Sequence, residues 1–369
     1  MKILLGICIC LIFSAVRAWE IADIVGDTTW LIRGGASQRA MLHTCREAKD
    51  QRPFQIEYED GSLLLKDAQG NCFAAVNGRG VAMSVSEGDP NTDPEPGAAV
   101  KPLTGAQVLA ALHPSCETAQ QAVGEVEKLF AAGRISGGWI FFFADAERAF
   151  VVESSSKHFA AQELTRAFCV YANSWKLPGM DETSIAPSKR AYTLAQKDWA
   201  AQEMLRRCKT DAGIAPAGSF AVSRFDKNDV NADEFTKARD PHDGRSKIEI
   251  SVHNDKSAGG FLCEIDKEFP AFLSCVYVAQ GAPRRAVYLP IPLGAAAVPQ
   301  LAAPAETAFG PRDPRIVDFE ANLLKEFEAT REEARQLLRA GKRDEAAKLL
   351  KENMLRQAAK ASEFLQTVK

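Results

Sequence analysis

Residues 139–153 read Trp139-Ile-Phe-Phe-Phe-Ala-Asp-Ala-Glu-Arg-Ala-Phe-Val-Val-Glu153, and this stretch decides the fold class. Two apolar runs, residues 139–143 and 150–152, flank the polar segment Asp145-Ala-Glu147. Apolar runs of this length around a short polar turn predict a hairpin of two buried antiparallel strands. We therefore expect a β-sheet whose two faces are both covered.

Short β-rich runs alternate with helical stretches on both sides of this hairpin. Strands are expected at residues 80–85, 138–143, 149–153, 168–172, 247–252, 275–278 and 286–291. Helices are expected at residues 104–112, 118–132 and 188–207, with Thr118 at the start of the second. The alternation predicts one α+β domain over residues 19–293.

The C-terminal part has a different composition. Residues 294–313 begin with an Ala/Pro-rich segment that we interpret as a linker, and residues 314–369 are almost all helix formers. Apolar residues recur at helical spacing on both sides of Gly341. This pattern predicts a helical hairpin that packs on the body of the protein or on a partner.

The N-terminus has the pattern of a secretory signal peptide. Lys2 precedes an apolar run over residues 3–16, and Val16-Arg-Ala18 places small residues at the −3 and −1 positions. A membrane anchor is the alternative, but the run is shorter than the roughly 20 residues of a membrane-spanning helix. We expect cleavage between Ala18 and Trp19, a secreted or periplasmic product, and no membrane attachment after the signal is removed.

Seven cysteines follow the signal segment, and an oxidising compartment would allow them to pair. Cys263 and Cys275 lie in two apolar runs separated by Asp266-Lys-Glu-Phe-Pro270. We predict a hairpin with a disulfide across it, and two buried free thiols are the alternative. No CxxC spacing occurs, so a zinc site is not indicated.

Composition excludes some classes of function. The 45 Lys and Arg against 48 Asp and Glu give a formal net charge of −3, without the basic excess of a nucleic-acid-binding protein. The five histidines are scattered, and no nucleotide-binding, zinc-protease or GxSxG motif occurs. We therefore expect no metal and no cofactor.

Five stretches carry a family resemblance: residues 37–47, 74–84, 139–153, 170–174 and 276–292. In order and spacing they resemble the N-terminal-nucleophile (Ntn) amide hydrolases. This group includes the penicillin acylase and bile-salt hydrolase type and the isopenicillin-N acyltransferase type. The resemblance implies a four-layer αββα sandwich, here followed by the helical hairpin.

The resemblance also implies a mechanism that this sequence departs from. A Cys, Ser or Thr at the mature N-terminus attacks an amide carbonyl, its own α-amine acts as base, and Asn side chains hold the oxyanion. Here Trp19 occupies the nucleophile position, Cys45 and Glu47 replace an Asn and an Asp, and Ser84 replaces an oxyanion Asn. A later Asn is retained as Asn173, and Arg224 is a candidate for a pocket arginine.

Three hypotheses about function follow. The first is an inactive binding or scaffolding protein in which Trp19 fills the former acyl pocket near Glu47, Ser84 and Asn173. The second is an active linear-amide hydrolase whose nucleophile lies elsewhere, and the third is a structural protein with a collapsed pocket. The ligand implied by the first is a small acyl-amide-like molecule or a protein partner.

Overall fold

The structure is a computed structural model of the chain. It describes ten stretches of the sequence: residues 27–33, 40–47, 54–88, 102–135, 137–180, 189–211, 213–225, 251–252, 257–309 and 313–368. Residues 1–26, which contain the expected signal peptide and Trp19, lie outside this part of the chain.

Thirteen strands in the described residues form two antiparallel sheets. The first has the order β10-β1-β2-β11-β12-β13 and contains β1 Thr28–Ile32, β2 Ala40–Glu47, β10 Phe168–Tyr171, β11 Ser257–Ile265, β12 Cys275–Gln280 and β13 Leu289–Pro292. The second runs in sequence order from β3 to β9 and contains β3 Gln55–Glu59, β4 Ser62–Lys66, β5 Cys72–Val76, β6 Ala82–Glu87, β7 Trp139–Ala144, β8 Ala149–Ser154 and β9 Phe159–Glu163.

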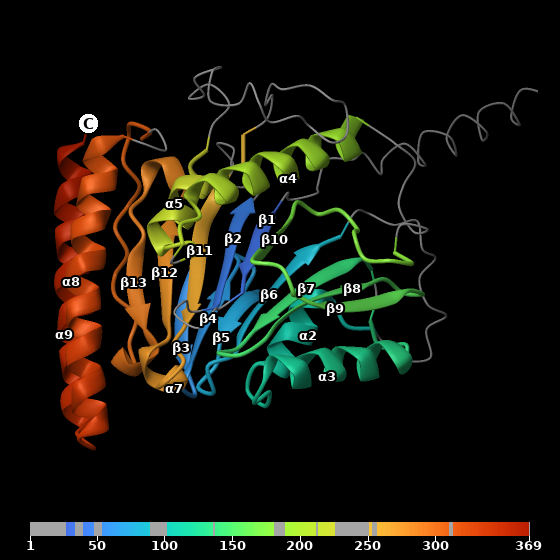
Figure 1. The fold of residues 1–369 in the computed structure, drawn as a ribbon, viewed down its shortest axis with the longest axis horizontal. Coiled ribbons are helices and arrows are strands. Elements are labelled where there is room, and N and C mark those ends of the chain that lie inside the picture. The colour runs from blue at the N-terminus through green and yellow to red at the C-terminus, as the bar shows by residue number, and fades with distance from the viewer. Residues whose placement is uncertain are drawn as a thin grey trace, which may run out of the picture.

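Helices cover the outer faces of both sheets, as Figure 1 shows. Helices α2 Gly105–Leu112 and α3 Ala119–Ala131 pack on the second sheet, through β5–β6 and β7–β8. Helices α4 Lys189–Cys208 and α5 Pro216–Ser223 pack on the first sheet, through β10 and β11. The layers are therefore helix, sheet, sheet and helix, which is the α+β arrangement expected from the sequence.

The predicted hairpin at residues 139–153 is confirmed and forms part of the sandwich core. β7 pairs with β8 from Trp139↔Ser154 to Ala144↔Ala149. Apart from Trp139, every residue of the two strands is buried, because one face meets the other sheet and the opposite face meets the helices.

Aromatic pairs join the two sheets across the core. Phe142 of β7 meets Tyr171 of β10 with ring centroids 5.5 Å apart. Phe73 of β5 meets Phe261 of β11 at 5.7 Å. Such contacts add to the large apolar area that buried aromatic side chains remove from water.

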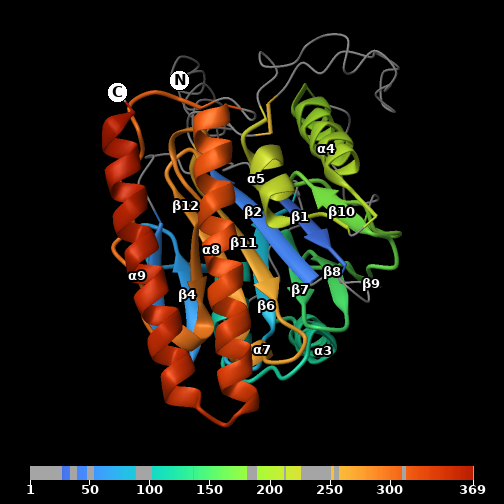
Figure 2. The same ribbon diagram turned by 60° about the vertical axis from the view of Figure 1, so that its left-hand side comes forward.

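The C-terminal residues form the predicted helical hairpin. Helices α8 Pro314–Arg339 and α9 Arg343–Thr367 lie side by side, as Figure 2 shows, and pack along β13 at the edge of the first sheet (Figure 1). Gly341 has φ +76, a conformation that glycine adopts without strain, and this allows the sharp reversal between the helices. The pair therefore packs on the body of the protein.

A buried ion pair anchors α8 to the domain. The Arg224 guanidinium donates to both carboxylate oxygens of Glu320, at 2.6 and 2.8 Å, and also to the carbonyls of Pro283 and Ala286. Arg224 is 1% exposed and Glu320 4% exposed. Arg224, a candidate pocket arginine in the sequence, therefore holds the helical hairpin in place through its ion pair with Glu320.

The predicted disulfide between Cys263 and Cys275 is wrong. Cys263 lies opposite Val276, and Glu264 lies opposite Cys275. Since neighbouring residues of a strand point to opposite faces of a sheet, the two thiols face away from each other. Both thiols are free and fully buried, which matches the alternative interpretation of this segment. The error arose from placing the hairpin register one residue out.

The strand expected at residues 275–278 begins at Cys275 as predicted and is β12, and the helical turn α7, Pro270–Leu273, precedes it. One strand boundary differs from expectation. The last strand begins at Leu289, because the preceding η3 Pro283–Arg285 and the Ala286 carbonyl are bound by Arg224. The strand expected at residues 247–252 lies outside the described residues except for Ser251 and Val252, which are not in a strand.

Within the described residues, no helix combines the length and apolarity needed to cross a membrane.

Candidate functional site

The inner faces of the two sheets meet at a chain of four buried hydroxyl groups. Thr29 and Thr44 come from β1 and β2, and Ser84 and Ser86 come from β6. The Thr29 Oγ1 lies 2.9 Å from Thr44 Oγ1 and 3.2 Å from Ser86 Oγ, while Thr44 Oγ1 lies 3.2 Å from Ser84 Oγ. All four side chains are at most 2% exposed. Hydroxyl groups can satisfy one another in this way because each both donates and accepts.

Cys45 does not join this cluster. Thr44 points toward the second sheet, so its neighbour Cys45 points to the outer face of the first sheet. His43 shares that outer face, and its Nε2 lies 3.1 Å from the hydroxyl of Tyr288. Desolvation in this setting, followed by the charge of Arg224, lowers the pKa of His43 well below its usual range. A neutral buried imidazole is the consequence.

Asn173 lies directly beyond β10 with a backbone conformation that is uncommon for a residue with a side chain. Its φ is +61, in the left-handed region that asparagine tolerates better than most residues. The side chain is fully buried, and Nδ2 donates to the carbonyl of Glu87 at 2.6 Å. The Oδ1 atom has no hydrogen-bond partner in the described part of the chain. An unpaired buried acceptor beside a strained backbone is typical of a functional position.

Trp175 lies two residues further on and packs against the same end of β6. A Cβ atom on Gly88 would lie only 2.3 Å from Cη2 of this indole, so the ring leaves no room for a side chain at residue 88. Trp175 is 7% exposed, and among the described residues its Nε1 donor is also without a partner. Residues 173–175 thus present one acceptor and one donor beside residues 87–88.

A buried carboxylate holds the segment that follows. The Glu153 carboxylate accepts the backbone N–H groups of Lys176 at 2.8 Å and Leu177 at 3.1 Å. Burial raises the pKa of Glu153 to about 7, and the hydrogen bonds from Leu177 and Lys176 act in the opposite direction. This group therefore gains or loses a proton near neutral pH.

The Lys176 side chain is tied down on the opposite side of this segment. Its ammonium group forms an ion pair with Asp198 of α4 and donates to the carbonyl of Val170 at 2.6 Å. It also lies 4.7 Å from the centroid of the Tyr171 ring. Glu153 and Lys176 together fix the chain between β10 and α4.

The sequence-predicted site residues are only partly brought together. Ser84 joins the hydroxyl cluster, and Asn173 bonds to β6 three residues beyond Ser84. Cys45 lies on the opposite face, only the backbone of Glu47 is described, paired with Ser257, and Trp19 lies outside the described residues. The placement of Trp19 in the pocket therefore stays a prediction.

Sequence reasoning missed several of the residues that lie around Ser84 and Asn173. Thr29, Thr44, Ser86 and Trp175 were not singled out. The spacing of Ser84 and Ser86 was an available signal, because residues two apart in a strand share one face, but the predicted strand ended at residue 85, before Ser86. The partner of that face could not be read from the sequence.

No metal site is indicated in the ranges that the structure describes. No group of three or more His, Cys, Asp or Glu side chains there is arranged to hold a metal ion.

The solved structures that this chain resembles include a penicillin V acylase and a bile acid hydrolase. A penicillin V acylase from Agrobacterium tumefaciens is 12% identical, with a TM-score of 0.41 over 72% of this chain and 86% of that chain. A mutant of the conjugated bile acid hydrolase from Clostridium perfringens is 8% identical, with a TM-score of 0.35 over 72% of this chain and 92% of that chain. Both names fall in the group that the sequence motifs resemble, but at these values the likeness carries no argument about the chemistry of this chain. No protein-family model and no curated protein sequence matches the chain.

Proposed function

We propose that this chain is an exported protein of the Ntn-hydrolase type that binds a small amide-containing ligand without hydrolysing it. The observation that carries the proposal is Asn173, whose buried side chain is fixed by the Glu87 carbonyl and keeps one acceptor unpaired. Export rests on the signal-like residues 1–18.

The state of the hydroxyl cluster favours binding over catalysis. Ser84, which replaces an oxyanion Asn in the resemblance, is fully buried, and its hydroxyl is within hydrogen-bonding distance of Thr44. An oxyanion donor must instead point at the place where negative charge develops on the substrate. The Asn173 amide nitrogen donates one hydrogen bond to the Glu87 carbonyl. Both side chains therefore already have a hydrogen-bond partner within the protein.

Asn173 Oδ1 is an acceptor and Trp175 Nε1 is a donor, and an amide carries one group that complements each of them. The N–H of a ligand can donate to Asn173 Oδ1, and the ligand carbonyl can accept from Trp175 Nε1. An unsatisfied buried polar atom costs about 1–3 kcal/mol, so pairing both atoms favours a ligand that carries an amide. An ester offers the carbonyl but not the N–H.

Binding of N-methylbenzamide and of methyl benzoate, measured by calorimetry, tests the recognition step. We expect the amide to bind at least about tenfold more tightly, since only the amide can donate to Asn173 Oδ1. Asn173→Gly tolerates the positive φ and removes the acceptor, and Trp175→Phe keeps an aromatic ring and removes the donor. Both should weaken amide binding, while Ser174→Ala should not. Equal affinity for amide and ester, or no effect of either variant, would contradict the proposal.

The mature N-terminus tests the loss of the nucleophile. We expect one chain that begins at Trp19 when the protein is exported with its own leader, because the signal is cut after Ala18 and Trp19 lacks the hydroxyl or thiol that self-cleavage requires. Intact-mass measurement and N-terminal sequencing of the exported material decide the point. A chain that begins at Cys, Ser or Thr, for example Thr28 at the start of β1, would favour the active amide hydrolase instead.

A further inference from the structure

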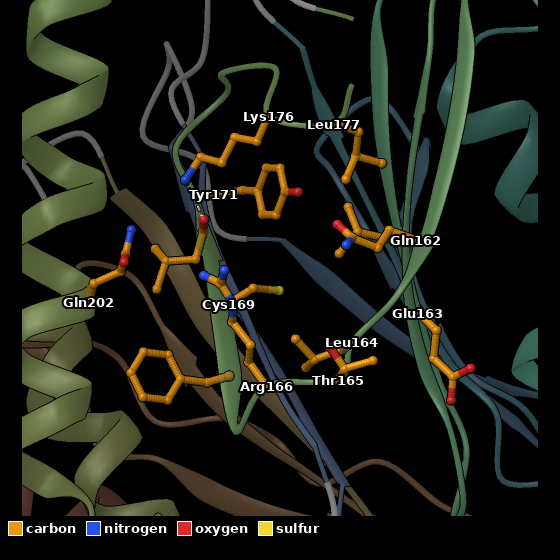
Figure 3. A pocket seen from close by; sticks show the side chains of 13 residues that line it. Gln162, Glu163, Leu164, Thr165, Arg166, Cys169, Tyr171, Lys176, Leu177 and Gln202 are labelled. Carbon is orange, nitrogen blue, oxygen red and sulfur yellow. Dashed lines mark hydrogen bonds between the residues drawn. The ribbon is translucent and has the colours of Figure 1, made fainter. Parts of the chain in front are cut away.

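A cavity of about 270 Å³ lies between the edge strands of the two sheets and helix α4, separate from the atoms proposed to bind the amide (Figure 3). β9 and β10, the loop between them and Gln202 of α4 contribute to its wall, together with Lys176 and Leu177. Asn173 and Trp175 are not among its lining residues. The cavity is therefore a distinct place where a ligand can enter the sandwich.

All but one of the charged side chains that line this cavity are paired with an opposite charge. Glu163 is neutralised by Arg148, with N–O distances of 2.6 and 3.1 Å, and Lys176 is paired with Asp198. Arg166 makes no ion pair or hydrogen bond within the described residues, and in Figure 3 its guanidinium extends toward Cys169 and Tyr171. Among the lining residues, Arg166 thus supplies the charge that a ligand can pair with, and a guanidinium suits a carboxylate. The guanidinium of Arg33 lies close by and donates to the carbonyl of Thr165 at 3.4 Å.

The remaining wall is mostly neutral. Burial raises the pKa of Cys169 to about 12, so the thiol stays protonated at neutral pH. The uncharged polar side chains of Gln162, Thr165 and Gln202 also line the cavity. Apolar side chains lie beside them around the Tyr171 ring: Val151, Leu164, Phe168, Val170 and Leu177. A wall that combines these apolar side chains with polar ones and one cation suits an amphipathic small molecule.

We infer that this cavity binds a monocarboxylate with an apolar body, the carboxylate on Arg166 and the body between β9 and β10. The site would be independent of the amide-binding atoms on residues 173–175. The two sites are neighbours, because Tyr171, Lys176 and Leu177, which line the cavity, lie in the same stretch of chain as residues 173–175.

Calorimetric titration with 3-phenylpropanoate and with 3-phenylpropan-1-ol tests this inference. We expect the carboxylate to bind and the alcohol, which has the same apolar body and no charge, to bind at least about tenfold more weakly. Arg166→Gln should remove that preference, and Arg166→Lys should retain part of it. Arg79→Gln, which changes an exposed arginine on the β5–β6 turn, is the matched control and should bind like the unmodified protein.

The outcomes are separable from the amide-binding proposal. Arg166→Gln should leave the binding of N-methylbenzamide unchanged, and Asn173→Gly should leave the binding of 3-phenylpropanoate unchanged. The inference is overturned if the carboxylate does not bind, if the alcohol binds equally well, or if Arg166→Gln has no effect.

Discussion

A Glu320→Ala variant is expected to lose about 3–5 kcal/mol of unfolding free energy, because it leaves the Arg224 guanidinium buried without a counter-ion. The carboxylate also accepts the backbone N–H of Tyr288 at 2.8 Å, so the variant removes a second partner. Urea unfolding followed by circular dichroism measures the loss.

Two further variants test whether the loss of stability comes from the burial of the ion pair. Glu345→Ala removes an exposed glutamate that pairs with Lys342 at 3.1 Å and should cost less than about 1 kcal/mol. The double variant Arg224→Met with Glu320→Leu removes both charges and should recover much of the stability lost in Glu320→Ala. If Glu320→Ala cost no more than Glu345→Ala, the ion pair would not be the anchor of α8.

The second large effect is a pH dependence that comes from Glu153. Burial raises the pKa of this carboxyl to about 7 from an ordinary value of 4.5, so the folded protein holds a proton that the unfolded chain releases. The stabilisation is fully present below pH 4.5 and is lost as the pH rises through about 7. At about 1.4 kcal/mol per pKa unit, the loss amounts to about 3 kcal/mol.

Urea unfolding at pH 5, 6, 7 and 8 measures this effect in the unmodified protein and in Glu153→Gln. The amide of the variant can still accept from the backbone of Lys176 and Leu177 but carries no charge. We expect the variant to gain stability relative to the unmodified protein as the pH rises, while Glu147→Gln on the same hairpin follows the unmodified protein. Parallel curves for Glu153→Gln and the unmodified protein would contradict the role given to this carboxyl.

The sequence was sufficient for elements with a local cause. The hairpin at residues 139–153 follows from two apolar runs around a polar turn, and both form as expected. Helices α2 and α3 begin after Thr104 and Thr118, whose side chains accept from the backbone N–H groups of Gln107 and Gln121. The C-terminal hairpin follows in the same way from helical spacing around Gly341.

Features that depend on register between distant strands could not be predicted. A shift of one residue between β11 and β12 separates Cys263 from Cys275. The same alternation sends Cys45 away from Ser84 although Thr44, its neighbour in sequence, contacts that serine. The hydrogen bond from Asn173 to Glu87 joins residues that are 86 positions apart, and no local sequence pattern predicts it.

Recovery of the ligand after binding tests the central claim most directly. The protein is incubated with about a tenfold molar excess of N-methylbenzamide for a day at neutral pH, and the released methylamine is measured by mass spectrometry. Binding without hydrolysis predicts that the amide is recovered intact and that methylamine stays at the level of a protein-free control. A molar amount of methylamine that equals or exceeds that of the protein would contradict the account. If this release were lost only in variants of residues at the amide site, it would establish a working amide hydrolase.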